Sequence, residues 1–256
     1  MDYEYSNVEK DGKLWVITLN RPERMNALHS PAHFELEEIF NEFSTDPDAW
    51  VAIITGSGDR AFCAGNDLRY QAEGGKLERN PMGFAGLTSR FDLKKPIIAA
   101  VNGFALGGGC EISLACHIRV ASETAKFGQP EVLLGILPGW GGTQRLPRLV
   151  GTGIANEIIT TGRMIDAQEA KEIGLANHVV PLEDLKQKCE EVANQILKNG
   201  PNAIAKSLEC IREGVGLTTK DGLDLEVKNF SSLFNSDETK EGLSAFVEKR
   251  VPNFRK

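Results

Sequence analysis

The chain has 256 residues, of which 41% are hydrophobic and 25% are charged, and its formal net charge at pH 7 is −7. A chain of this length buries enough apolar surface to need no disulfide or metal for stability, and its acidic balance argues against nucleic-acid binding. Five cysteines without a C-x-x-C pair, an acidic N-terminus and no aliphatic run longer than Ile97 to Val101 predict a cytoplasmic protein with reduced thiols and no membrane segment.

The first half of the chain alternates strand-like and helix-like segments. Residues 14–19 (LWVITL) form a β-rich run. Ser30-Pro31 then begins a predicted helix, whose apolar residues recur at i, i+3, i+4 and i+7 spacing as Leu36, Ile39, Phe40 and Phe43. Short apolar runs predict further strands at 51–55, 97–101 and 118–121. Strands separated by helical crossovers indicate a mainly parallel sheet.

From about residue 182 onward the pattern is helical. Apolar stripes at helical spacing are formed by Leu185, Cys189, Val192 and Ile196, by Leu223, Val227, Phe230 and Phe234, and by Leu243, Phe246 and Val247. Residues 72–90 are rich in glycine and weakly periodic, which predicts a mobile loop. We therefore predict an α/β core over residues 1–195, followed by a helical C-terminal region over residues 196–256.

Several common catalytic motifs are absent from the sequence, among them G-x-S-x-G, the P-loop, G-x-G-x-x-G and H-E-x-x-H. His29 and His33 are four residues apart, but Pro31 lies between them at a helix start and no third ligand is in sight. We therefore expect no metal site there.

Two glycine-rich turns follow predicted strands. Gly107 to Gly109 stand where the strand at 97–101 is followed by a helical run, and such a turn leaves backbone N–H groups free to stabilise a developing negative charge. The alternative is that these glycines only permit close helix–strand packing. The small-residue turn at 63–65 follows another strand, and Asn66 after it supplies a second N–H. Two such turns meeting at strand ends would form a two-donor oxyanion hole.

Two glutamates follow glycine-rich segments. Glu111 falls one turn into the glycine-initiated helix, and Glu131 follows Gly-Gln-Pro ahead of an aliphatic run. Burying an ionised carboxylate among apolar residues costs several kcal/mol unless it is paired or hydrogen-bonded. The alternative is that both are capping or surface glutamates. Together with the two glycine turns, they are interpreted as functional.

Long blocks of this sequence resemble the signature blocks of the crotonase superfamily, and most closely those of short-chain enoyl-CoA hydratases. The blocks are FCAGNDL, NGFALGGGCE, FGQPEVLLGILPGWGGTQRL and EGLSAFVEKRVPNF, and the similarity begins at LNRPERMNAL. The resemblance implies a spiral of ββα units with a helical trimerisation region, and hence a homo-oligomer, either a trimer or a dimer of trimers. It also implies an acyl-CoA thioester substrate, in which CoA is part of the substrate and no separate cofactor is needed.

The resemblance also implies roles for four residues. The thioester carbonyl would lie between the backbone N–H groups of Asn66 and Gly108. Glu111 would orient and deprotonate a water that attacks Cβ, and Glu131 would deliver a proton to Cα, so that a short-chain trans-2-enoyl-CoA becomes a 3-hydroxyacyl-CoA. Two carboxyl groups that share one water repel each other, so we expect one raised pKa and one shared proton.

Binding residues are carried over from the matching blocks. Arg24 is placed to meet a CoA phosphate, and Lys249 resembles a residue that reaches the CoA of a neighbouring subunit; for each, the alternative is a solvated surface charge. Pro138-Gly139 and Trp140 are predicted to open a helix near the acyl end, where Trp140 either narrows the pocket toward short acyl chains or packs in the core. The full set predicted to bind substrate is Arg24, Met25, Leu28, Ala64, Asp67, Leu68, Pro138, Gly139, Trp140 and Lys249.

Alternative functions remain open on the same scaffold. One is an enoyl-CoA isomerase, which needs only one proton shuttle, and another is a hydratase of a cyclic or branched enoyl-CoA. Asn66 stands where many relatives have alanine, and its side chain enters the site, so the acyl group stays undetermined. The alternative from another class is a non-catalytic acyl-CoA or RNA-binding protein, against which the acidic balance and the glutamate pair both count.

Overall fold

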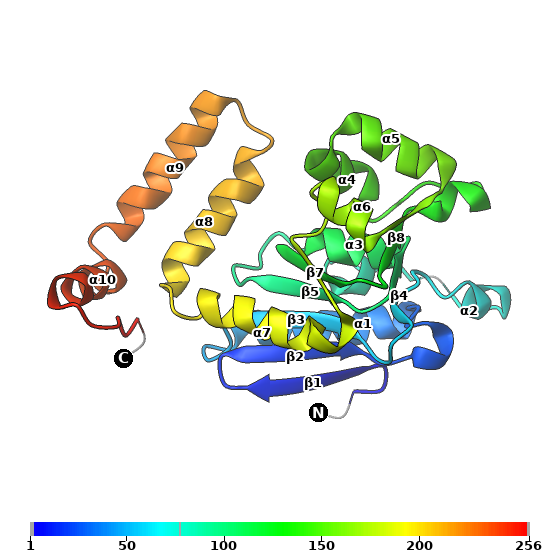
Figure 1. Cartoon of the computed structure of the whole chain (residues 1–256), viewed down its shortest axis with the longest axis horizontal. Helices are drawn as coiled ribbons and strands as arrows, with labels where there is room; N and C mark the ends of the chain where they lie inside the picture. Colours follow the sequence, from blue (N-terminus) through cyan, green and yellow to red (C-terminus); the bar gives the residue numbers. More distant parts are fainter. Residues whose placement is uncertain (1–2, 77, 255–256) are drawn as a thin grey trace.

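The larger of two sheets forms the base of the fold. The structure, a computed structural model, describes residues 3–76 and 78–254. Six strands hydrogen-bond in the order β1-β2-β3-β5-β7-β10, and all neighbours are parallel except β1 and β2 (Figure 1). The strands are β1 (Ser6–Asp11), β2 (Leu14–Leu19), β3 (Val51–Gly56), β5 (Ile97–Val101), β7 (Ile118–Ser122) and β10 (His178–Val180). The prediction of a mainly parallel sheet is confirmed.

A smaller sheet carries the turns of interest. Its order is β4-β6-β8-β9, with β9 antiparallel to β8, and its strands are β4 (Ala61–Cys63), β6 (Phe104–Leu106), β8 (Lys126–Gly128) and β9 (Met164–Asp166). The successive pairs β3–β4, β5–β6 and β7–β8 each place one strand in the large sheet and one in the small sheet, and each pair is followed by a helix. This repetition is the spiral of ββα units that the sequence predicted.

The helices of the core cover the sheets. The first, α1 (Ser30–Thr45), begins one residue before Pro31, and its four predicted core residues are fully buried, because they form one apolar stripe. The other core helices are α2 (Leu68–Ala72), α3 (Gly108–Ala115), α4 (Gly142–Val150), α5 (Thr152–Thr161) and α6 (Ala167–Glu172). Short 3-10 helices are η1 (Pro22–Arg24), η2 (Phe84–Gly86), η3 (Pro130–Leu134) and η4 (Leu182–Asp184).

The last quarter of the chain is helical, as predicted. Helix α7 (Leu185–Ile196) packs on the large sheet, where Leu185 and Cys189 join a buried cluster with residues of β3, β5 and β7. Beyond it, α8 (Pro201–Gly214), α9 (Thr219–Leu233) and α10 (Asp237–Glu248) form a C-terminal arm, residues 201–254, that extends away from the core (Figure 1). No helix in the described part of the chain is both long and apolar enough to cross a membrane.

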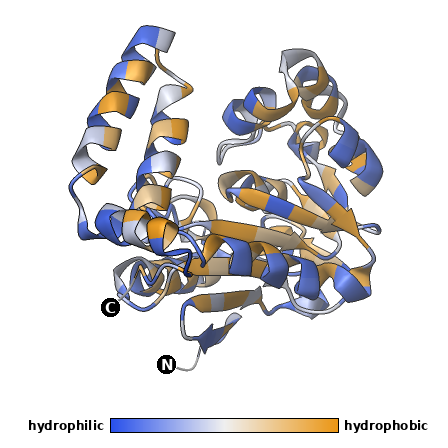
Figure 2. Cartoon of the chain, turned by 60° about the vertical axis from the view of Figure 1, so that its left-hand side comes forward, coloured by the Kyte–Doolittle hydropathy of each residue, from blue (hydrophilic) through white to orange (hydrophobic). Residues whose placement is uncertain are grey.

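The predicted apolar stripes of the C-terminal arm are exposed in the single chain. Phe230 is 63% exposed, Phe234 is 61% exposed and Phe246 is 84% exposed. Figure 2 shows hydrophobic residues recurring along these helices, which rise away from the sheets. Large exposed apolar patches mark interaction surfaces. The predicted oligomeric assembly therefore has a candidate surface, and it stays a prediction.

The segment from 80 to 90, which we call the wall segment, corrects one prediction. Residues 72–90 were predicted to form a mobile loop, but Phe84, Ala85 and Leu87 are no more than 3% exposed. The backbone amide of Ala85 donates to His33 Nδ1 on α1 at 3.0 Å. The prediction is wrong for the wall segment. It relied on the weak hydrophobic periodicity of these residues, whereas their burial depends on individual tertiary contacts. Residue 77, in the same predicted loop, lies outside the described residues.

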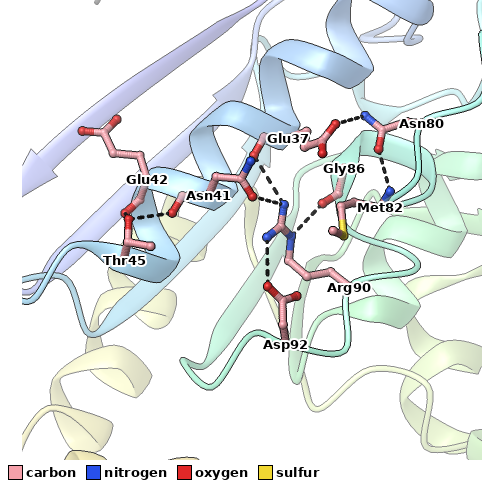
Figure 3. A network of polar contacts seen from close by, with 9 residues as sticks. All are labelled: Glu37, Asn41, Glu42, Thr45, Asn80, Met82, Gly86, Arg90 and Asp92. Carbon is pink, nitrogen blue, oxygen red and sulfur yellow. Dashed lines mark hydrogen bonds and ion pairs between the residues drawn. The ribbon is translucent and has the colours of Figure 1, made fainter.

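A buried arginine fixes the wall segment to α1 (Figure 3). The Arg90 guanidinium donates to the carbonyl oxygen of Gly86 at 3.0 Å and to that of Glu37 at 3.4 Å. It also donates to Asn41 Oδ1 at 2.8 Å, and Asn80 donates to the Glu37 carboxylate at 2.8 Å. These bonds supply polar partners to the wall segment and tie it to α1, so an irregular segment can be buried.

Candidate active site

A cavity of about 370 Å³ lies where the small sheet meets the wall segment. Its walls come from the turns after β4 and β6, from η2 and η3, and from the residues just before α4. The residues that line it are Ala64, Gly65, Asn66, Leu68, Gln71, Phe84, Gly107, Gly108, Pro130, Glu131, Leu134, Ile136, Leu137, Gly139 and Trp140. Seven of the predicted site residues are in this set.

The two glycine turns touch each other, as predicted from their positions after strands. Gly65 and Gly107 have positive φ angles of 95° and 54°. A Cβ on Gly65 would stand 2.8 Å from the Leu106 carbonyl oxygen and 3.2 Å from the Gly108 nitrogen, so only glycine allows this approach. The amides of Asn66 and Gly108 donate to no protein acceptor in the described part of the chain. Two uncommitted N–H groups therefore lie together at the cavity wall.

Glu111 is held by one oxygen only. It lies in the first turn of α3 and is 1% exposed. Its Oε1 accepts hydrogen bonds from the amides of Trp140 at 2.7 Å and Gly142 at 2.8 Å, and its Oε2 has no partner in the described protein. Burial raises the pKa of Glu111, while the two amides and the charge of Arg145 oppose that rise. Because two amides fix Oε1, the direction of the unpartnered Oε2 is fixed as well.

Glu131 is the second residue of η3, and its carboxylate lies against the same glycine turn. Its Oε1 lies 3.3 Å from the position that a Cβ on Gly107 would take. Burial raises the pKa of Glu131 to about 7, and the charge of Glu111 adds to that rise. With its amide nitrogen turned toward Glu131, the fully buried Gln129 donates to both carboxylate oxygens, at 3.1 Å and 3.3 Å. This arrangement provides two coupled carboxyl groups beside the two free amides.

Trp140 packs against the core, which is one of the alternatives predicted for it, and that it narrows the pocket toward short acyl chains stays a prediction. It lines the cavity, and its ring centroid lies 6.1 Å from that of Phe84, against the buried core. The predicted helix start at Pro138-Gly139 is three to four residues early, since α4 begins at Gly142. The intervening turn is needed, since it supplies the two amides that hold Glu111.

Some of the predicted binding residues support the turns and do not line the cavity. Leu28 is fully buried, and its amide donates to the Gly65 carbonyl oxygen at 2.9 Å. Asp67 is 5% exposed; its carboxylate pairs with Arg21 at 2.9 Å and caps α2 through the Tyr70 amide at 3.1 Å. These contacts fix the chain on both sides of Asn66.

The remaining predicted binding residues lie in two places. Arg24 ends η1, and Met25 beside it accepts a hydrogen bond from the Ala64 amide at 3.0 Å, next to the cavity. Pro138 is buried just behind Gly139. Lys249 lies at the C-terminal end of α10, at the opposite end of the molecule from α2 (Figure 1). Within one chain, Lys249 is therefore not part of this site.

The sequence interpretation assigned no role to two residues around the acids, Gln129 and Arg145. Gln129 lies between Gly128 and Pro130 and contacts Glu131. An amide side chain two residues before a predicted catalytic glutamate, inside the GQPE block, was the available signal. Arg145 contacts residues up to 57 positions away, for which the sequence offered no signal. In the described part of the chain, no group of three His, Cys, Asp or Glu side chains is placed to hold a metal ion.

Comparisons with known proteins agree with this geometry. The sequence profile of the enoyl-CoA hydratase/isomerase family matches residues 9–256. The chain is 44% identical over 252 residues to the short-chain-enoyl-CoA hydratase of Clostridium acetobutylicum, covering 96% of this chain and 97% of that one. It is also 44% identical over 258 residues to the crotonyl-CoA hydratase of Syntrophomonas wolfei, covering 99% of each.

A solved structure extends the comparison to three dimensions. The crystal structure of an enoyl-CoA hydratase from Bacillus anthracis superposes with a TM-score of 0.90 at 40% sequence identity, covering 98% of this chain and 99% of that one. The similarity thus includes the spiral core and the C-terminal arm. The chain belongs to the enoyl-CoA hydratase/isomerase family, the crotonase superfamily that its sequence blocks predicted.

Proposed function

We propose that this protein is an enoyl-CoA hydratase, which adds water across the 2,3-double bond of a short-chain trans-2-enoyl-CoA to give a 3-hydroxyacyl-CoA. One arrangement carries the proposal. Glu131 and the two uncommitted amides line one cavity, and the buried Glu111, bonded to the amide of the lining residue Trp140, is close enough for its charge to raise the pKa of Glu131. An isomerase needs only one proton shuttle, so the second carboxyl group favours hydration. The names of the relatives from C. acetobutylicum and S. wolfei support the same activity.

The two amides would act on the thioester carbonyl. With the carbonyl oxygen accepting from the N–H groups of Asn66 and Gly108, Cβ becomes electrophilic and the enolate-like transition state gains two fixed donors. Loss of one such donor typically costs about 3–4 kcal/mol of transition-state stabilisation. The donors are preorganised, because the contact between the two turns sets their spacing before substrate binds.

The two glutamates would divide the proton transfers. Ionised Glu111 takes a proton from water through its free Oε2 as the water oxygen bonds to Cβ. The electrons of the double bond move toward the thioester, and protonated Glu131 then gives its proton to Cα. A pKa of about 7 leaves Glu131 partly protonated at neutral pH, and the two amides on Glu111 favour its ionised form.

The cofactor, location and assembly belong to the same proposal. Hydration moves a proton and a hydroxyl group without any change of redox state, so we infer that CoA enters only as part of the substrate and that no resident cofactor is used. Arg24 and Met25 would meet the CoA moiety beside Ala64, and Lys249 would serve the site of a neighbouring copy. We infer a cytoplasmic homo-oligomer, a trimer or a dimer of trimers.

A substrate panel tests the activity. The purified protein is mixed with crotonyl-CoA, with longer and with cyclic or branched trans-2-enoyl-CoAs, and with a β,γ-unsaturated acyl-CoA, and loss or gain of the enoyl-thioester absorbance is followed. We expect loss of absorbance, fastest with crotonyl-CoA. Activity on the β,γ-unsaturated substrate alone would make the protein an isomerase. Binding of acyl-CoA or RNA without turnover of any of these substrates would make it a non-catalytic binding protein.

A further inference from the structure

Arg145, on α4, joins two walls of the active site. Its Nη2 donates to the carbonyl oxygen of Thr88 in the wall segment at 2.7 Å, and its Nη1 donates to the carbonyl oxygen of Trp140 at 3.4 Å. Thr88 is itself 2% exposed, and its hydroxyl accepts from the Phe84 amide at 2.8 Å. One guanidinium therefore connects the segment that carries Phe84 to the turn that carries Trp140.

That turn is the one that orients Glu111. The amide of Trp140 donates to Glu111 Oε1 at 2.7 Å, while the carbonyl of the same residue accepts from Arg145. Gly141 has a φ of 114°, and a Cβ there would stand 2.1 Å from Arg145 Nη1. The guanidinium thus lies directly against the backbone of the turn. Trp140 is the one residue that connects it to Glu111.

The charge of Arg145 has no close counterion. In the described part of the chain it forms no ion pair with a carboxylate, in contrast to Arg163 and Arg250, which each pair with glutamates. Burial lowers the pKa of the Arg145 guanidinium, and the negative charge of Glu111 raises it. The same interaction lowers the pKa of Glu111. A half-buried cation is therefore balanced by the catalytic carboxylate at longer range.

We propose that Arg145 is a positioning residue for Glu111: it anchors the peptide that orients the acid and supplies the positive charge that favours the ionised carboxylate. The proposal rests on the proposed hydratase function. In this role Arg145 touches neither substrate nor reacting atoms. It acts through the Trp140 turn and through the electric field at Glu111.

Few other charged or titratable groups face Glu111. The elements packed against α3 are α4, β4, β6 and η2. On α4, Arg148 is exposed and donates to the Gln144 carbonyl oxygen of its own helix. Cys63 of β4 and Cys110 of α3 are buried thiols whose pKa burial raises to about 12, so both stay neutral. Arg119 of β7 donates to the carbonyl oxygens of Ser113 and Cys116, toward the C-terminal end of α3. Glu131 on η3 is the carboxyl group whose pKa the charge of Glu111 raises.

The test compares Arg145→Gln and Arg145→Lys with Arg148→Gln, a matched loss of charge on the exposed side of the same helix. Each full-length variant is assayed with crotonyl-CoA for kcat, KM and the pH dependence of kcat/KM. We expect Arg145→Gln to lower kcat by about 10- to 100-fold with KM changed less than about threefold, because a displaced turn misplaces the acid and not the thioester. We expect the acidic limb of its kcat/KM–pH profile to move to higher pH. Without the positive charge of Arg145, the ionised form of Glu111 is less favoured and the pKa of Glu111 rises.

Arg145→Lys keeps the charge, but its single compact ammonium lacks the planar fork with which Nη1 and Nη2 reach the separate carbonyl oxygens of Trp140 and Thr88. We therefore expect its acidic limb to stay at the wild-type pH and its kcat to fall about three- to tenfold. A wild-type kcat in Arg145→Lys would overturn the anchoring role, even if Arg145→Gln failed to fold. A soluble Arg145→Gln with the pH profile and kcat of Arg148→Gln would overturn both roles. Failure of the wild type to hydrate crotonyl-CoA would instead reject the proposed function.

Discussion

Glu131 combines partial burial with a neighbouring carboxylate, and its pKa is raised from 4.5 to about 7 as a result. At neutral pH such a group both gives and takes a proton readily, which is the condition for general acid catalysis near that pH. Burial also raises the pKa of Glu111, the other member of the pair, but two amide donors oppose that rise and stabilise its ionised form. The different surroundings of two identical side chains thus assign them different roles.

Replacing Glu131 by glutamine removes the proton donor and keeps the shape. We expect kcat for crotonyl-CoA hydration to fall by about three orders of magnitude or more, since general acid–base transfer contributes about 10²–10⁴-fold and the coupled pair is lost with it. Acyl-CoA binding, measured by calorimetry with a saturated butyryl-CoA, should survive. Glu123→Gln, an exposed glutamate after β7, is the control. Lost affinity with retained kcat would contradict the assigned role.

The same substitution should change stability in a pH-dependent way. The folded-state pKa of Glu131 lies above its ordinary value of 4.5, so the wild type is unpenalised below pH 4.5 and loses stability as the pH rises to about 7. Glutamine has no proton to lose. We expect Glu131→Gln to match the wild type at pH 4.5 and to exceed it by about 1 kcal/mol at pH 8, after allowance for its partial exposure. Urea unfolding at both pH values, at one protein concentration, measures the difference, and equal stability at pH 8 would contradict it.

At the scale of elements, strands and helices of the core were predictable where the pattern was long. Strands β3 and β5 of the large sheet are short runs of mostly apolar residues, and α1 has a full apolar stripe, whereas the edge strand β1 (SNVEKD) is mostly polar and was not predicted. The strands β4, β6 and β8 have three residues each, which is too short for a readable alternation. The wall segment escaped prediction because its contacts with His33 and Glu37 on α1, 52 and 53 positions away, decide its burial.

The candidate site was predictable to a similar degree. Glu111, Glu131 and the two amide turns follow glycines at strand ends, so local sequence marks them. Gln129 contacts Glu131 two positions along the chain, so the GQPE block carried its signal. Arg145 contacts Thr88, 57 positions away, and no local pattern distinguishes it from a surface residue. Leu28 and Asp67 were carried over from the family blocks as binding residues, and the structure gives them contacts that fix the turn around Asn66.

The two aromatic side chains that line the cavity lead to a prediction about the length of the acyl chain. Trp140 and Phe84 close one side of a cavity of about 370 Å³, and Arg90 and Arg145 fix the segments that carry them. We expect Trp140→Ala to raise kcat/KM for a ten-carbon enoyl-CoA relative to crotonyl-CoA by about tenfold, the scale of one or two added methylenes. Phe91→Ala, at a residue 63% exposed and outside the cavity lining, is the control. An unchanged ratio would show that the acyl chain leaves the cavity elsewhere.

At the scale of the whole molecule, the C-terminal arm predicts assembly. Val227, Phe230 and Phe234 lie on one stripe of α9 and are each more than 60% exposed. We expect the wild type to sediment as an oligomer and Phe230→Glu/Phe234→Glu to dissociate at about 100-fold higher concentration, since burial of each phenylalanine contributes about 1.5–3 kcal/mol. Lys220→Glu, an exposed change on α9, should leave assembly intact. A wild type that sediments as a monomer at every concentration would reject the inferred oligomer.

The spiral also determines the order in which the site residues are added during synthesis. Its first turn (β3–β4) leads to Asn66, its second (β5–β6) to Gly108 and Glu111, and its third (β7–β8) to Glu131, after which residues 140–142 bind Glu111. In chain order both amide donors and Glu111 therefore precede the proton donor, and Glu111 has no oriented oxygen until residues 140–142 have been added.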